Sequence, residues 1–356
     1  MQLHPSYSAT DDDLLKFVRD HAGADAEVFP LAGDASSRRY FRAVSGDKSY
    51  VLMLWEPFVD DAHYPFLSVL DHFAKHGVQV PAVVAKSPAQ GLVLLEDLGD
   101  LTLERKFWEN QNQQVAVPFY RLAIDELIKI HYPATFDRSE SCTAFHVQFD
   151  VEKLLWEMNY GREHLMMRLC KINLSTVEEK ALNAIFLDIC ERLNAEEKFI
   201  AHRDYHSRNA MIKLGKLRVI DFQDARMGAI QYDLVSLLRD SYVRLDDNIA
   251  EGLISYYLDR RVEACAGRSI RDASRARFDE IYEMQTIQRC FKACGSFASF
   301  YNLRKDVRYL KYLHQTLQTV ARSLRLFPHY AAFYEALDAR GIFATIFDDE
   351  QLIGQL

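Results

Sequence analysis

The chain has 356 residues, of which 49% are hydrophobic and 26% charged, and its 43 basic and 51 acidic residues give a formal net charge of −8. This ordinary globular composition excludes disordered, collagen-like and disulfide-dense small proteins, and the acidic balance argues against a general nucleic-acid coat or a polybasic membrane binder. The length, about twice that of a common domain, predicts two lobes around a shared cleft.

The sequence gives no sign of a membrane or secretory segment. No apolar run approaches the roughly 20 residues that cross a bilayer, and the N-terminus lacks the basic and apolar leader pattern. The six cysteines follow no disulfide spacing. Cys290 and Cys294 stand one helical turn apart, but two thiols without further ligands are more typical of a core than of a metal site. We therefore expect reduced thiols in a cytoplasmic protein with no nucleic-acid, membrane or obligatory protein partner.

The N-terminal part is predicted to be a small sheet with helices beside it. Thr10 followed by three aspartates has the pattern of a capped helix start. A second helix is expected to end at Gly77. Short alternating apolar runs bounded by turn residues predict five strands. These strands cover residues 26–31, 40–44, 50–55, 83–85 and 92–95.

Beyond Gly99 the apolar residues recur mostly at helical spacing, over 118–131, from 151 onward and over 310–324. One clear hairpin interrupts this pattern, with strands over 210–214 and 217–220. The organisation predicted is a lobe of sheet and helices over residues 1–98 and a larger helical lobe over residues 99–356.

The stretch from residue 202 to 233, HRDYHSRNAMIKLGKLRVIDFQDARMGAIQYD, carries the chemistry. Asp204 and Asn209 lie in a loop before the first strand of the hairpin, and Asp221 ends its second strand. Because a tight hairpin brings its outer ends together, Asn209 and Asp221 should face each other. Such hard oxygen donors suit Mg²⁺, which leaves Asp204 to orient or deprotonate an attacking hydroxyl.

This division of roles is that of a kinase catalytic loop, H-R-D-x-x-x-x-N, followed by a metal-binding Asp. Over nearly its whole length the chain resembles the aminoglycoside-phosphotransferase branch of the protein-kinase-like fold. The resemblance implies an α+β bilobal fold, with a small antiparallel-sheet N-lobe, a large mainly helical C-lobe and ATP between them. It also implies Asp204 as catalytic base and Asn209 and Asp221 as Mg²⁺ ligands. His206 would lie near the transferred phosphate, and Asp233 would support the catalytic loop.

The same resemblance implies where the nucleotide binds. A loop between the first two strands would meet the phosphates, although it keeps one glycine where a protein kinase has three, and residues 94–98 would form the hinge that meets adenine. The residues expected to contact the nucleotide are Gly33, Asp34, Ser36, Ser37, Arg38, Glu96 and Leu98.

Longer phrases narrow the resemblance to one subgroup. Residues 33–42 (GDASSRRYFR), 202–209 (HRDYHSRN), 221–225 (DFQDA) and 232–240 (YDLVSLLRD) are similar to bacterial anomeric sugar kinases, which phosphorylate N-acetylmuramate and N-acetylglucosamine at C1 in peptidoglycan recycling. The resemblance implies a small-molecule sugar substrate. The candidate sugar contacts are Gln223, Asp224, Arg239 and Asp240, with bracing of the helix after Tyr232 as their alternative role.

One position departs from the kinase pattern. The third predicted strand has Met53 where a kinase has its phosphate-binding lysine, and a thioether cannot neutralise phosphate charge. We hypothesise that Arg38 or Arg39 supplies the charge. Strand alternation sends the two to opposite faces, so only one can point into the cleft. The alternative is that both are solvated surface charges.

Other interpretations stay open. His202 and His206 have the spacing of a helical zinc pair, but Arg203 stands where a metalloprotease has Glu. A different small-molecule kinase, for aminoglycosides or choline-like substrates, would share every catalytic residue. A non-catalytic nucleotide-binding pseudokinase would explain Met53, although the complete set of Asp204, Asn209 and Asp221 argues against it.

The segment 260–308 has eleven basic and six acidic residues in a chain that is acidic overall. One interpretation is a basic wall that favours a sugar with a carboxylate. The alternative is a solvated helical surface. A polycationic aminoglycoside would prefer an acidic pocket, so this excess argues against that substrate.

Overall fold

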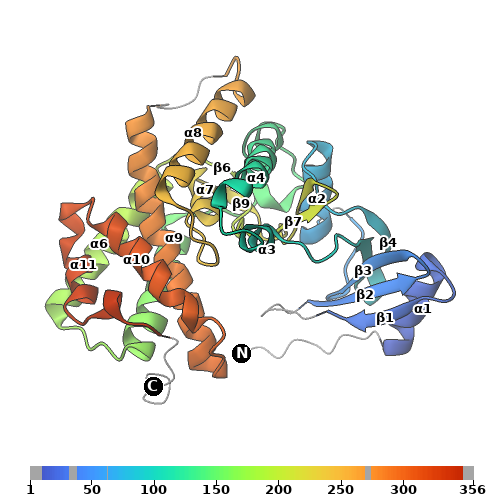
Figure 1. Cartoon of the computed structure of the whole chain (residues 1–356), viewed down its shortest axis with the longest axis horizontal. Helices are drawn as coiled ribbons and strands as arrows, with labels where there is room; N and C mark the ends of the chain where they lie inside the picture. The colour runs from blue at the N-terminus through green and yellow to red at the C-terminus, as the bar shows by residue number, and fades with distance from the viewer. Residues whose placement is uncertain (1–9, 32–37, 62, 269–273, 348–356) are drawn as a thin grey trace.

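The computed structural model describes residues 10–31, 38–61, 63–268 and 274–347, and it has two parts. Figure 1 shows a sheet at one side of the molecule, in blue, and a larger assembly of helices at the other. Within the described ranges, no helix is both long and apolar enough to span a bilayer.

The N-terminal part is a five-stranded antiparallel sheet in the order β1-β2-β3-β5-β4. The five predicted strands are confirmed, with ends shifted by a few residues. Their bounds are β1 Glu27–Pro30, β2 Arg39–Ser45, β3 Lys48–Leu54, β4 Val83–Ser87 and β5 Leu92–Glu96.

The two faces of this sheet pack against different partners. Helix α1 (Asp11–Ala22), capped by Thr10 as predicted, contributes a buried cluster with alternate residues of β2, β3 and β5, such as Phe41 and Leu52. The other face, which includes Met53, joins helix α2 (Pro65–Lys75) and the main core. The α2 ring of Phe66 stacks on Phe222, with centroids 5.2 Å apart. Helix α2 therefore links the sheet to the residue that follows Asp221.

The C-terminal part is built from helices. Helices α4 and α5 continue into π-helical turns over Ile130–Ala134 and Arg162–Leu169. The α-helices are α3 Leu103–Trp108, α4 Val117–Lys129, α5 Val151–Gly161, α6 Thr176–Asn194, α7 Gln231–Leu238, α8 Asp247–Ala264, α9 Arg275–Arg304, α10 Leu313–Leu324 and α11 Ala331–Asp338.

Two small sheets lie among these helices. The predicted hairpin is confirmed as β7 (Ala210–Lys213) and β8 (Lys216–Val219). A second pair, β6 (Phe199–Ala201) with β9 (Arg226–Gly228), was not predicted. Each of these strands has three residues, too few to show an alternating pattern, and they pair across the whole catalytic segment. The pairing of β6 with β9 therefore brings together the two ends of this segment.

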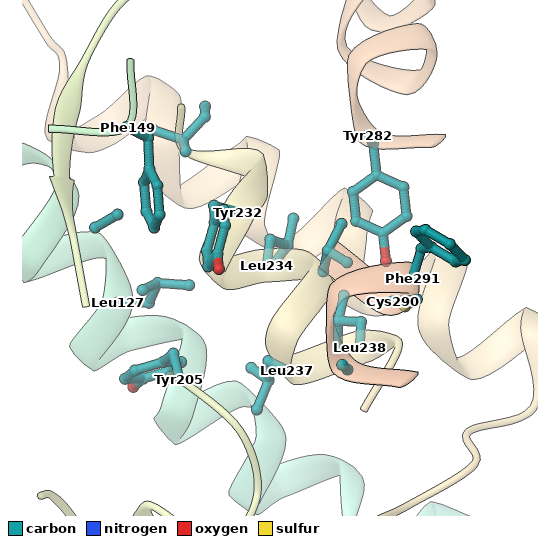
Figure 2. Packing of buried hydrophobic residues seen from close by; sticks show 14 of the residues in the cluster. Leu127, Phe149, Tyr205, Tyr232, Leu234, Leu237, Leu238, Tyr282, Cys290 and Phe291 are labelled. Atoms are coloured by element: carbon teal, nitrogen blue, oxygen red, sulfur yellow. The ribbon is translucent and has the colours of Figure 1, made fainter. Parts of the chain in front are cut away.

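Helix α7 is buried along its whole length at the centre of this core. Figure 2 shows its Tyr232 beside Phe149, and the two rings stack with centroids 4.2 Å apart. Tyr205 of the catalytic segment lies near Leu127 of α4 in the same view, and its hydroxyl donates to the Ala123 carbonyl at 2.7 Å. The core thus holds the catalytic segment from two sides. Cys290 and Cys294 are fully buried free thiols, as predicted.

Helices α5 and α9 approach each other closely where Gly161 meets Gly295. A Cβ added at Gly295 would lie 2.5 Å from the Gly161 Cα and 2.8 Å from its nitrogen. We expect Gly295→Ala to lower the free energy of unfolding by about 1–3 kcal/mol, because the two backbones must move apart. Gly252→Ala in α8, where nothing lies within 4 Å, should raise it by about 0.5–1 kcal/mol through helix propensity. Urea unfolding of both variants checks this, and equal stabilities would contradict it.

Candidate active site

The catalytic segment, residues 202–209, runs between β6 and β7 and is held by Asp233 of α7. The Asp233 carboxylate accepts hydrogen bonds from the backbone N–H groups of His202 at 2.6 Å and Arg203 at 2.9 Å. The backbone φ of Arg203 is +81°, a left-handed conformation that non-glycine residues seldom adopt. Asp233 stabilises this conformation and so fixes the direction of Asp204. Its predicted supporting role is confirmed.

His202 is a structural residue, as predicted. Its ring is fully buried, and its Nε2 lies 3.0 Å from the Ile220 carbonyl oxygen. In the part of the chain that the structure describes, no group of three His, Cys, Asp or Glu side chains could hold a metal ion. The zinc interpretation therefore has no support in this geometry.

The hairpin brings Asn209 and Asp221 together, as its spacing predicted. The Asn209 Nδ2 lies 3.3 Å from the Asp221 Oδ2 and 2.9 Å from the Asp204 carbonyl oxygen. The Asp221 side chain is 35% exposed, and its backbone φ is +65°. One carboxylate and one amide, both accessible, form a small set of hard oxygen donors. Such a set fits Mg²⁺, which usually takes one or two carboxylates and fills its other positions with phosphate oxygens and water.

The charges around Asp204 keep it ionised. Burial by itself would raise the pKa of this carboxyl, but nearby cations, first Lys292 and then Arg203, hold the pKa well below its usual value. Asp204 is therefore an anion throughout the neutral range. Lys292 was not predicted from the sequence, because it lies on α9, far along the chain, and only the packing of α9 brings it here.

His206 lies beside the metal-ligand pair but carries no charge at neutral pH. Burial lowers its pKa to about 3. Its Nε2 lies 3.5 Å from the Asn209 Nδ2, and its ring packs edge-on against Tyr242. The imidazole is thus placed to act through hydrogen bonds rather than as a cation. Its expected role near the transferred phosphate stays a prediction.

Of the two arginines before and at the start of β2, the structure places Arg38 between the two parts of the molecule. Its Nη2 lies 2.8 Å from the Asp221 Oδ1, and its side chain is 10% exposed. Arg39 lies on the opposite side, exposed, with its guanidinium 5.0 Å from the centre of the Phe41 ring. The alternation argument is confirmed, and Arg38 is not a solvated surface charge.

Arg38 also lies on the sheet face of the missing lysine. Tyr40 of β2 is the register partner of Met53 in β3, so the two side chains share a face. Arg38 precedes Tyr40 by two residues and projects from that same face. Its guanidinium lies 5.5 Å from the centre of the Trp55 ring, which continues β3. Arg38 therefore provides a cation on the sheet face that carries Met53, the residue at the lysine position, although Met53 itself is fully buried and neutral.

The remaining nucleotide candidates fall in two places. Gly33, Asp34, Ser36 and Ser37 lie outside the described residues. Glu96 and Leu98 lie at the crossing from the sheet to the helices. Leu98 is buried there.

The side chains at this crossing are held by hydrogen bonds. Lys213 of the hairpin donates to the Glu96 Oε1 at 2.9 Å and to the Asp97 carbonyl at 2.7 Å. Arg42 pairs with the Asp97 carboxylate at 2.7 Å. The hairpin that carries the metal-ligand pair is thus tied directly to the connection between the two parts.

The four candidate sugar contacts separate into two pairs. Gln223 donates to the Asp221 Oδ1 at 3.0 Å, and Asp224, 48% exposed, pairs with Arg203 at 3.2 Å. Both lie beside the catalytic segment. Asp240 is buried and accepts from the Ser207 N–H at 2.9 Å, while Arg239 pairs with Asp247 at 3.2 Å. The contacts of Asp240 favour the bracing role for that residue.

Comparisons with known proteins identify relatives of this chain. The sequence pattern of the "Phosphotransferase enzyme family" matches residues 27–267. A protein of Neisseria meningitidis serogroup B named N-acetylmuramate/N-acetylglucosamine kinase is 30% identical over 316 residues, which cover 88% of this chain and 90% of that protein. A protein of the same name from Pseudomonas aeruginosa is 29% identical and covers 80% of both chains.

Solved structures show the same fold at low sequence identity. A choline/ethanolamine kinase family protein from Mesorhizobium loti aligns with a TM-score of 0.57 at 16% identity, covering 91% of this chain and 98% of that one. An ADP-bound aminoglycoside phosphotransferase aligns with a TM-score of 0.56 at 18% identity, covering 88% and 99%. The predicted kinase-like fold is thereby confirmed.

Proposed function

The chain belongs to the phosphotransferase enzyme family, and from this premise we propose that it is an ATP-dependent kinase that phosphorylates the anomeric C1 hydroxyl of N-acetylmuramate or N-acetylglucosamine. The observation that carries the proposal is that the Asn209 side chain lies within hydrogen-bond distance of both the Asp221 carboxylate and the Asp204 backbone carbonyl, which brings the three residues together. The names of the relatives support the two sugars as substrates. The complete set of three residues disfavours a pseudokinase.

The roles of the residues follow from their positions. Asn209 and Asp221 would hold Mg²⁺, which when bound offsets negative charge on the phosphate oxygens. Asp204 accepts the hydrogen bond of the attacking hydroxyl and aims it at the phosphorus. Its low pKa makes it a weak base, and an anomeric hydroxyl is more acidic than an ordinary alcohol. Orientation therefore contributes more than proton removal.

The other parts of the proposal concern ATP and location. We place the nucleotide between the two parts, with Arg38 toward its phosphates and the connection at Glu96 and Leu98 toward its base. The boundary between the lobes is proposed at residue 98, after β5 and before α3. A cytoplasmic location, where ATP is available, agrees with six free cysteines, and a place in cell-wall recycling follows from the proposed sugars.

Incubation of the purified protein with ATP, Mg²⁺ and a panel of acceptors tests this function. We expect ATP consumption with N-acetylmuramate and N-acetylglucosamine, at rates at least about tenfold above those with kanamycin or choline. The reason is that contacts made with the correct substrate and lost with another acceptor change the activation free energy by a few kcal/mol. The product should be a non-reducing sugar phosphate that dilute acid hydrolyses. Chelation of Mg²⁺ should abolish turnover. Phosphorylation that leaves the sugar reducing would contradict C1 as the acceptor, and exclusive use of kanamycin or choline would contradict the substrate class.

A further inference from the structure

Two lysines lie where helices α5 and α9 cross beside the catalytic segment. The Gln288 side chain of α9 donates to the Glu157 carboxylate of α5 at 3.0 Å. Lys153 lies one turn before Glu157 on α5, and Lys292 lies one turn after Gln288 on α9. Both lysines are therefore on the helix faces that meet at this crossing.

Neither lysine belongs to an ion pair within 4 Å among the residues that the structure describes. The Lys153 Nζ instead lies 4.0 Å from the centre of the Trp156 ring. The Glu157 carboxylate is fully buried, and one of its oxygens accepts a hydrogen bond from Gln288. The two ammonium groups thus lie outside the ion pairs of the described residues, with Glu157 as an anion near Lys153 and Asp204 as an anion near Lys292.

Further cations surround the same place. Arg203 reaches the Asp224 carboxylate at 3.2 Å, and Arg226 of β9 lies 4.0 Å from it. Burial lowers the pKa of Lys153; the charge of Glu157 opposes this shift, and those of Arg203, Arg226 and Lys292 add to it. The lysine therefore lies within the field of three other cations. Asp204 lies in the field of Lys292 as well, so this positive region borders the position of the attacking hydroxyl.

We propose that Lys292, together with Lys153, binds the carboxylate of a substrate sugar and so favours N-acetylmuramate over N-acetylglucosamine. The inference rests on the proposed function. The two sugars have the same ring and the same anomeric hydroxyl, and they differ in the lactyl ether of N-acetylmuramate, which carries the carboxylate. The ammonium groups of Lys292 and Lys153 at this helix crossing recognise that difference by charge. Lys292 belongs to the basic segment 260–308, so the proposal assigns a role to one basic residue of that segment.

The test is the ratio of kcat/KM for N-acetylmuramate to kcat/KM for N-acetylglucosamine. We expect Lys292→Gln to lower this ratio about 10- to 100-fold, the value of a hydrogen bond to a charged group. Lys153→Gln should lower it in the same direction, and Lys292→Arg should retain much of it. Lys180→Gln, on the exposed surface of α6, is the matched control and should leave the ratio unchanged. A structural role of Lys292 would reduce both activities together and would not move the ratio.

An unchanged ratio in both the Lys292→Gln and Lys153→Gln variants would overturn the inference, including the case in which the activities with both sugars fall by the same factor. If the unaltered protein phosphorylates neither sugar, the proposed function fails, and calorimetric binding of the two sugars without ATP separates the two questions. A preference for N-acetylmuramate that Lys292→Gln abolishes would still support the carboxylate site, and equal binding of both sugars would reject it.

Discussion

Replacement of Asp204 by Asn is expected to lower kcat about 10²- to 10⁴-fold, the usual contribution of a positioned acid–base group. The affinity for Mg²⁺ and ATP should change less than about threefold, since the predicted metal ligands are other residues. Asn has nearly the shape of Asp, and the loop is held by Asp233 and Tyr205 rather than by Asp204. Steady-state kinetics and equilibrium binding of a fluorescent ATP analogue measure the two quantities.

A matched variant gives the opposite pattern. Asp221→Asn removes the one carboxylate of the predicted metal-ligand pair, so it should raise the Mg²⁺ concentration needed for half-maximal turnover. A kcat near that of the unaltered protein in Asp204→Asn would remove Asp204 from its catalytic role. Weakened nucleotide binding in that variant, with kcat preserved, would make Asp204 a metal ligand instead.

The lowered pKa of Asp204 also predicts how kcat depends on pH. The depressed folded value means that the ionised carboxylate is present above the ordinary Asp pKa near 4 and is lost only as the pH falls below it. An acidic limb of kcat between pH 5 and 8 would then belong to another group. His206, with a pKa lowered to about 3, is excluded from that range as well.

The parts of the site that the sequence predicted are those set by local geometry. A hairpin turn at Gly215 is enough to bring Asn209 and Asp221 together, because the register of a tight hairpin follows from its turn. The supporting role of Asp233 was instead implied by the resemblance to the kinase family, because its hydrogen bonds to His202 and Arg203 join segments that lie far apart in the chain. The sheet and the main helices were predictable because their apolar residues recur at strand or helix spacing over enough positions for the pattern to be recognised.

The parts that the sequence did not predict depend on packing between distant segments. The pairing of β6 with β9 has no periodic signal, and Lys292 lowers the pKa of Asp204 only because the packing of α9 brings the two residues near each other. The sequence predicted that Arg38 and Arg39 point to opposite faces of the sheet, but it did not predict which of them points toward the site. Which face of β2 turns toward Asp221 is decided by the packing of α1 on one face of the sheet and of α2 on the other.

Arg38 is the residue for which this packing matters most. We expect Arg38→Met to raise the KM for ATP on the order of 100-fold, because the variant loses the charge-assisted hydrogen bonds that the guanidinium, 10% exposed, would make to the phosphates. Arg39→Met, one residue away on the opposite face, is the matched control and should change KM less than about twofold, as exposed charges contribute little. Arg38→Lys should recover part of the loss. Thermal unfolding of all three variants separates a loss of nucleotide affinity from a loss of fold.

The contact between Arg38 and Asp221 makes this prediction decisive. In the described structure the Arg38 guanidinium donates a hydrogen bond to one oxygen of Asp221, the carboxylate that is predicted to bind Mg²⁺. If Arg38 only neutralises Asp221, its removal frees that carboxylate, and the KM for ATP with Mg²⁺ should fall or stay the same. If Arg38 moves to the phosphates when ATP binds, the KM must rise, because Met53 cannot offset the charge. The direction of the change in KM therefore shows whether Arg38 takes the place of the kinase lysine.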